Sequence, residues 1–84
     1  MSLIYIGRQG AKKIFVTAYC QKRLQQRNLS AKEVLYILAH REVNYPTDVD
    51  GRQKIRSTVN GSKKAFLTVF ENRQRVIVIT GGEA

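Results

Sequence analysis

The sequence predicts an α+β fold in which an N-terminal helix hairpin packs on an antiparallel sheet of at least four strands. Two observations support this prediction: helix-start signals and helically spaced apolar residues occupy residues 17–40, and the apolar pattern changes to a period of two from residue 42 onward. Helices and strands that follow one another in separate blocks are typical of α+β proteins. A chain of 84 residues suits one domain, so residues 1–84 are assigned to a single unit.

The first helix is predicted over residues 17–28. Thr17 is a suitable N-cap, because its hydroxyl can accept a hydrogen bond from a free backbone N–H of the first turn. Asn28 can end the helix, since asparagine tolerates the left-handed conformation that is common at helix C-termini. Cys20 and Leu24 are spaced so that both face the core.

The second helix, residues 30–40, is the most clearly marked element. Ser30 followed by Glu33 forms a capping box, in which each side chain accepts a hydrogen bond from a backbone N–H at the helix start. The apolar stripe at helical spacing consists of Ala31, Val34, Leu35 and Leu38. The two helices together are predicted to form a hairpin over residues 17–40.

The rest of the chain is predicted to form an antiparallel meander over residues 42–80. The Asp50-Gly51 and Asn60-Gly61 pairs are typical hairpin turns. Pro46 marks the first strand as an edge, because proline has no N–H for a ladder. The expected strands lie near residues 42–48, 52–59, 64–71 and 75–80.

The last two strands are expected at the centre of the sheet, with neither face left to water. Their sequences, AFLTVF and VIVI, are apolar on both faces. Two helices can cover only one face of a sheet. We therefore expect residues 1–16, as an extended segment or a hairpin, or a second copy in a homodimer, to cover the other face.

The charge of the chain favours a polyanionic partner. Fifteen Lys and Arg stand against six Asp and Glu, for a net charge of +9, and residues 1–32 hold seven cations and no acid. We therefore expect a nucleic acid, with RNA favoured, or an acidic protein as the partner. The predicted nucleic-acid-binding residues are Lys12, Lys13, Lys22, Arg23 and Arg27.

Tyr19, Arg23 and Arg27 form a row at successive i, i+4 steps beside the core face of the first helix. This row is expected at the rim between helix and sheet. An arginine there either covers apolar surface with its stem or directs its guanidinium to a phosphate. The acid-free sequence around it favours phosphate.

Other residues indicate structural roles. His40 falls at a predicted helix C-terminus, where a cationic ring complements the helix dipole. Cys20 is expected as a buried filler, and a single cysteine excludes a disulfide framework. DVDG at residues 48–51 is expected to be a hairpin turn and not a calcium loop. We expect no metal or cofactor, no membrane segment and a cytoplasmic location.

The segment FVTAYCQKRLQQRNLSAKEVLYIL resembles the opening of a bacterial family of small uncharacterised domains, domain of unknown function 4258. The family pattern continues with a second helix and a sheet. The stretch RVIVIT of this chain resembles the closing strand of that sheet. The resemblance implies a helix-hairpin-plus-sheet layout like that of RelE-like and barnase-like ribonucleases. The residues that match or conservatively replace the family pattern are Arg23, Leu24, Arg27, Asn28, Leu29 and Ser30.

The chain departs from that pattern at Tyr19, where the family has histidine, and at Cys20, where alanine is usual. Metal-independent RNA cleavage needs a general base, a general acid and a cation beside the phosphorane. Arg23 and Arg27 could supply the cation, but tyrosine is a weak substitute for a histidine base. We expect an RNA-binding module related to toxin-like ribonucleases. The alternatives are an active ribonuclease that uses Tyr19, Arg23 and Arg27, and an interaction domain for an acidic protein in a toxin–antitoxin context.

Overall fold

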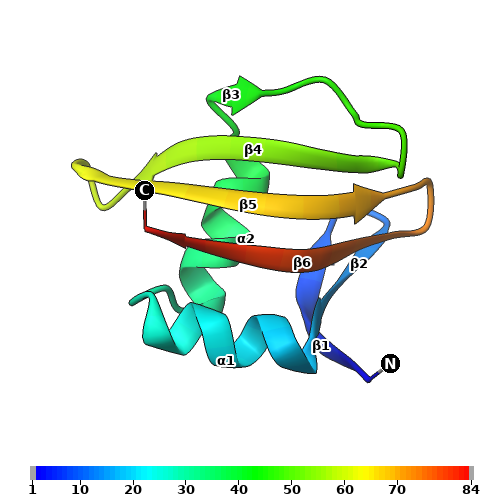
Figure 1. Ribbon diagram of the computed structural model, residues 1–84, viewed down its shortest axis with the longest axis horizontal. Helices are drawn as coiled ribbons and strands as arrows, with labels where there is room; N and C mark the ends of the chain where they lie inside the picture. The colour runs from blue at the N-terminus through cyan, green and yellow to red at the C-terminus, as the bar shows by residue number, and fades with distance from the viewer. Residues whose placement is uncertain (1, 84) are drawn as a thin grey trace.

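The computed structural model describes residues 2–83 and contains two helices and six strands (Figure 1). The elements are β1 Leu3–Gln9, β2 Lys12–Thr17, α1 Ala18–Gln26, α2 Ala31–Ala39, β3 Val43–Asn44, β4 Arg52–Val59, β5 Lys63–Glu71 and β6 Arg75–Glu83. The strands form one sheet in the order β1-β2-β6-β5-β4-β3. Neighbouring strands are antiparallel except β2 and β6, which run parallel.

The predicted fold class was wrong. The sheet is mixed and not antiparallel, and two strands precede the helices, which are therefore not an N-terminal hairpin. The physical reason lies in β6, whose backbone N–H and C=O groups need partners on both sides. β5 supplies one side, and residues 13–16 of β2 supply the other. The helices also pack on the sheet individually, α1 against β6 and β2 and α2 against β1 and β4.

The N-terminal segment forms a hairpin but does not cover the second face of the sheet. β1 and β2 pair in antiparallel register, and β2 then joins β6 in the plane of the sheet. The apolar stretches LIYI and KIFV thus widen the sheet instead of adding a layer. The expectation that residues 1–16 would cover the second face is wrong for the described residues 2–16.

Both helices begin at their predicted caps. The Oγ1 atom of Thr17 accepts a hydrogen bond of 3.0 Å from the backbone N–H of Cys20. Ser30 and Glu33 form the expected capping box, with bonds of 3.2 and 3.0 Å. Asn28 follows α1 with a φ angle of 58°, which is the left-handed conformation. These features depend on neighbouring residues, so the local sequence was sufficient to predict them.

The strands confirm the central position of residues 64–71 and 75–80 and the edge position of the first predicted strand. β5 and β6 are the two middle strands, and β3 lies at one edge. The predicted strand 42–48 shortens to Val43–Asn44. Pro46 follows closely and has no N–H to donate to β4, so the regular ladder ends before it.

The core lies between the helices and one face of the sheet. Figure 1 shows α2 behind the sheet and α1 along its lower border. Within residues 2–83 no helix lies on the other face, which we call the open face. Neither helix of residues 2–83 has the length and apolar character of a membrane-spanning helix. The largest fully buried core side chains include Ile14, Ile37, Leu38, Ile55, Leu67 and Val78.

Candidate nucleic-acid interface

The open face carries an apolar row that crosses four neighbouring strands. Tyr5 of β1 pairs with Phe15 of β2, and the two rings meet edge to face with centroids 5.7 Å apart. Ile77 of β6 pairs with Phe15 on one side and with Phe70 of β5 on the other. Paired residues direct their side chains to the same face of a sheet. Tyr5 is 52% exposed and Phe70 38%, so the row presents aromatic surface to solvent.

A second aromatic position lies further along β5. The ammonium group of Lys54 lies 5.3 Å from the ring centroid of Phe66 and 5.8 Å from that of Tyr45. These distances are typical of cation–π contacts. Thr68 and Thr80 pair with each other between this position and the apolar row, so hydroxyl groups lie at the centre of the open face.

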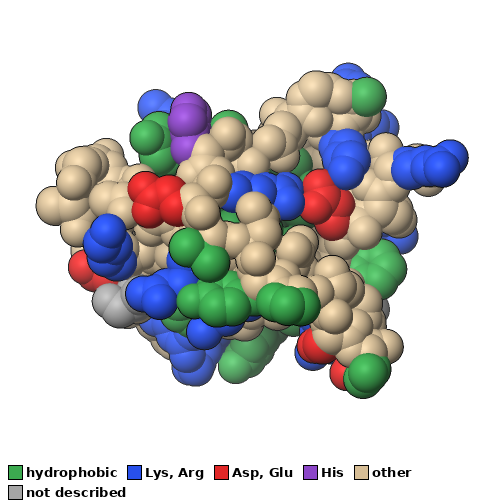
Figure 2. All heavy atoms as spheres, turned by 90° about the horizontal axis from the view of Figure 1, so that it is seen from above, with side chains coloured by type: hydrophobic (Ala, Val, Ile, Leu, Met, Phe, Trp, Pro, Cys, Tyr) green, Lys and Arg blue, Asp and Glu red, His purple; other side chains and the backbone are tan. Residues whose placement is uncertain are grey.

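Cations surround these aromatic rings. Every charged residue that strand register directs to the open face, within the strands of residues 3–83, is Lys or Arg. Glu42 reaches only the margin, where its Oε1 atom accepts a hydrogen bond of 3.0 Å from Thr58. Figure 2, which views the molecule from the β3 side, shows blue cationic and green hydrophobic side chains together at the left and centre of its lower border, with red acidic side chains at the lower right. The open-face cations are Arg8, Lys13, Arg52, Lys54, Arg56, Lys64 and Arg75.

A hollow of about 570 Å³ lies at one corner of the open face. The ring of Phe15 lines it together with three cations, Lys13, Arg73 and Arg75. Lys13 and Arg75 are paired residues of the parallel strands β2 and β6, which fixes their side chains next to each other. The hollow thus combines one aromatic ring with three positive charges, and such side chains can form charge-assisted hydrogen bonds with an anion.

The predicted row on α1 lies at the margin of the open face. The side chain of Arg27 packs over Gly82, with Cδ 2.6 Å from the position of an ideal Cβ on that glycine. Gly82 pairs with Phe66, so Arg27 reaches the edge of the open face. Arg23 lies one turn earlier, 5.7 Å from the ring centroid of Tyr19, which is 63% exposed. Arg27 therefore lies at the rim between helix and sheet, where the row was predicted.

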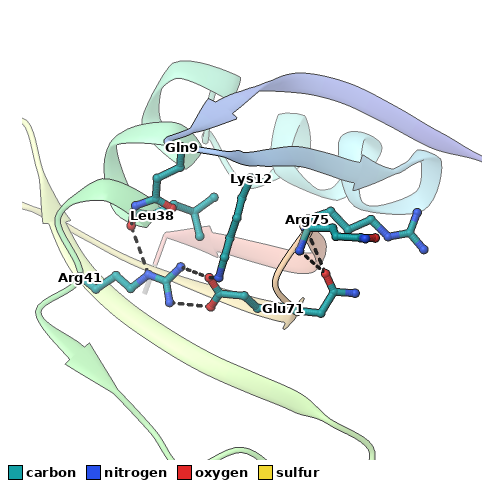
Figure 3. Close-up of polar contacts among 8 residues, drawn as sticks. Gln9, Lys12, Leu38, Arg41, Glu71 and Arg75 are labelled. Carbon is teal, nitrogen blue, oxygen red and sulfur yellow. Dashed lines mark hydrogen bonds and ion pairs between the residues drawn. The ribbon is translucent and has the colours of Figure 1, made fainter.

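Lys12 belongs to a different part of the molecule. Its ammonium group lies 2.8 Å from the carboxylate of Glu71, which also accepts bonds of 3.0 and 3.2 Å from Arg41 (Figure 3). Burial alone would raise the pKa of Glu71, but the hydrogen bonds from Arg41 and Lys12 outweigh it and lower that pKa. The Glu71 carboxylate thus pairs with both cations on the helix side of the sheet. Lys12 is therefore not part of the open face, although it was predicted to bind nucleic acid.

Only Lys13 of the three predicted lysines lies on the open face. Lys22 is exposed on α1. Cys20 is fully buried, and burial raises the pKa of its thiol to about 11, which fits the predicted filler role. His40 is the C-cap of α2 and stacks on Tyr36 with ring centroids 4.2 Å apart. Within residues 2–83 no group of three or more His, Cys, Asp or Glu residues is arranged to hold a metal ion.

The sequence reasoning missed the contribution of the later strands. Arg52, Lys54 and Arg56 alternate along β4 and all lie on the open face. Phe66 and Phe70 follow the same alternation on β5. Cations at every second residue of a predicted strand were the available signal, because such residues share one face of a sheet.

Comparison of the chain with protein-family models, with curated proteins and with solved structures gives no match. The resemblance to domain of unknown function 4258 therefore stays a prediction.

Proposed function

We propose that this protein is a nucleic-acid-binding module, with RNA as the favoured ligand, and that the open face is its binding surface. One observation carries the proposal: the charged strand residues of the open face are all Lys or Arg and surround exposed aromatic rings. A phosphate backbone is the abundant polyanion that such a surface complements. Phosphate binding alone would require only cations. Stacking on bases also explains why aromatic rings are exposed on this surface.

RNA is favoured over DNA by the hydroxyl groups at the centre of the open face. Thr68 and Thr80 can exchange hydrogen bonds with a ribose 2′-hydroxyl, which DNA lacks. Arg27 adds a cation next to Gly82 of β6, and Arg23 lies one turn earlier on α1, beside Tyr19. Their position supports the phosphate-binding interpretation of this row.

The salt dependence of RNA binding tests the proposal. Each cation that contacts a phosphate of a single strand contributes about 0.7 to the slope of log K against log salt concentration. Arg56→Ala, on the open face, should weaken binding and lower this slope. Lys32→Ala removes an equal charge from an exposed position on α2 and is the matched control. Absence of RNA binding at low salt, or equal effects of both variants, would contradict the proposed function.

A further inference from the structure

We infer that the ligand is a single-stranded polynucleotide, whose bases stack on the apolar row while its phosphates follow an adjacent row of cations. This inference rests on the proposed nucleic-acid-binding function and specifies the form of the ligand. Lys13 stands two residues before Phe15 on β2, and Arg75 stands two residues before Ile77 on β6. Two residues of a strand span about 7 Å, so the cations run beside the apolar side chains on the same face.

The apolar row has the size for a short stretch of bases. It crosses β1, β2, β6 and β5, and three steps between neighbouring strands span about 14 Å. Sheets that bind single-stranded RNA stack roughly two or three bases on aromatic rings over a comparable width. Phe70 and Tyr5 are exposed at the two ends of the row, which leaves a ring available at each end.

A duplex would leave the apolar row without a partner. Its bases are paired and stacked on one another inside the helix, so a flat sheet could contact only its phosphates and sugars. The cations alone would then account for binding, and the aromatic rings would remain exposed to water. A single strand can contact the apolar row with its bases and the row of cations with its phosphates at the same time.

The hollow at the corner of the open face is suited to one nucleotide of that strand. Phe15 offers a ring for a base, and Lys13, Arg73 and Arg75 surround the same space of about 570 Å³. Arginine can bind phosphate oxygens with two N–H groups, so a cluster of this kind is suited to be a phosphate-binding site. The contact of this phosphate would anchor the strand at the β2–β6 end of the open face.

A second copy of the chain is a poor occupant of the open face. In a two-fold symmetric dimer each surface meets itself. The cations that surround the apolar row would then face an identical set of cations, and like charges across an interface are unfavourable. A polyanion removes this conflict, because its phosphates neutralise the same cations.

Fluorescence anisotropy with three labelled probes tests the inference. The probes are an unstructured RNA of about 12 nucleotides, a DNA of the same sequence and the corresponding RNA duplex. The proteins are the wild type, Phe70→Leu, Phe15→Leu and the control Tyr36→Leu, which removes an exposed aromatic ring from α2. Leucine keeps the position apolar, and circular dichroism and thermal unfolding verify that each variant is folded.

We expect the single strands to bind more tightly than the duplex. Phe70→Leu and Phe15→Leu should weaken single-strand binding by about fivefold or more, because loss of a stacking ring costs about 1 kcal/mol or more per base. Duplex binding should change little, and Tyr36→Leu should affect no probe. The RNA and DNA arms show which sugar is preferred.

Two outcomes separate the inference from the proposed function. Equal, salt-dependent binding of duplex and single strands, unaffected by Phe70→Leu and Phe15→Leu, would overturn the single-strand inference and leave nucleic-acid binding intact. No binding of any probe would overturn both. Light scattering provides an independent check of whether the protein forms a dimer. If Phe70→Arg disrupts a dimer that single-stranded RNA does not dissociate, the open face is the interface with a second copy.

Discussion

Arg27 of α1 lies directly over Gly82 of β6. A Cβ atom on Gly82 would be 2.6 Å from Cδ and 2.9 Å from Cβ of Arg27. The absence of a side chain at Gly82 thus allows α1 to lie close to the C-terminal half of β6, beyond the stretch where β2 pairs with that strand. The same contact holds the aliphatic part of the Arg27 side chain at the margin of the open face.

Gly82→Ala should destabilise the protein less than Gly81→Ala. At Gly82 the new methyl group meets the Arg27 side chain, whose Cδ can rotate away but whose Cβ, 2.9 Å away, requires a small shift of the C-terminal end of α1, so we expect a cost of about 1 kcal/mol. At Gly81 it would lie 2.8 Å from the backbone oxygen of Phe66 in an interior strand, so we expect about 2 kcal/mol or more. Urea unfolding measures both values. Arg27→Ala in the Gly82→Ala background should recover part of the loss, and equal costs at both glycines would contradict this account.

The Glu71 cluster should make stability depend on pH. The pKa of Glu71 is lowered from its ordinary value of 4.5 in the folded protein, since the hydrogen bonds from Arg41 and Lys12 outweigh the opposing effect of burial. A lowered carboxyl pKa stabilises the fold above about pH 4.5, and this contribution is lost as the pH falls through the folded-state pKa. Glu71→Gln should therefore lower the free energy of unfolding at pH 7 by about 2 kcal/mol and flatten its decline in acid.

A control for the pH prediction is available at the opposite end of β5, where Lys63 pairs with Glu33. The pKa of Glu33 is also lowered, first by the hydrogen bond from the Ser30 backbone N–H. Glu33→Gln should leave the part of the acid-induced loss that depends on Glu71. If the free energy of unfolding depends on pH in the same way in the wild type and in Glu71→Gln, the cluster does not stabilise the fold.

Cys20 should be unreactive in the folded protein. Its side chain is fully buried, and burial raises the pKa of the thiol to about 11, so very little thiolate is present at pH 8. We expect a disulfide reagent to label Cys20 at a rate limited by opening of the structure, and within the mixing time in denaturant. Rapid stoichiometric labelling of the folded protein would contradict the burial of this side chain.

The features that the sequence predicted correctly are local. Ser30 with Glu33 and the left-handed Asn28 each determine structure through bonds within a few residues. Pro46 acts locally as well, because its missing N–H limits the ladder of β3. These signals were sufficient for the two helices and for the position of most strands.

The pairing of β2 with β6 could not be predicted in the same way. It joins residues 13–16 to residues 75–78 through backbone hydrogen bonds, which carry no sequence signal of their own. The stretch KIFV has the pattern of a buried strand and fits an added layer, a dimer contact or an added strand equally well. The choice follows from the free edge of β6, which becomes evident only when the whole sheet is assembled.

The charge distribution along the chain did not indicate the open face, for a similar reason. Residues 33–84 contain nearly balanced charges, so the acid-free N-terminal third seemed to hold the binding surface. In the fold, however, Glu33 pairs with Lys63 and Glu71 with Arg41, both away from the open face. Because the fold places these two acids away from the open face, they do not neutralise the cations of β4. A count of charges along the chain does not detect this spatial separation of acids from cations.

The last prediction is that the protein binds RNA without cleaving it. Attack of a 2′-hydroxyl on its own phosphate needs an acid and a base within hydrogen-bond reach. The strand positions of the open face, within residues 3–83, carry no His, Asp or Glu, and His40 caps α2 in the helix layer. Tyr19, the residue in place of the histidine expected from the family resemblance, is exposed next to Arg23.

Tyr19→His is therefore the informative variant. A histidine one turn before Arg23 could serve as base or acid while the arginines stabilise the phosphorane, and we expect it to raise cleavage about 10²-fold over the wild-type background. Gel electrophoresis of labelled RNA in the presence of a chelator measures the rates. Tyr36→His, at an exposed position on α2, is the matched control and should stay at background. Wild-type cleavage that Arg23→Ala and Tyr19→Phe both abolish would show instead that Tyr19 itself performs the chemistry and that the protein is an active ribonuclease.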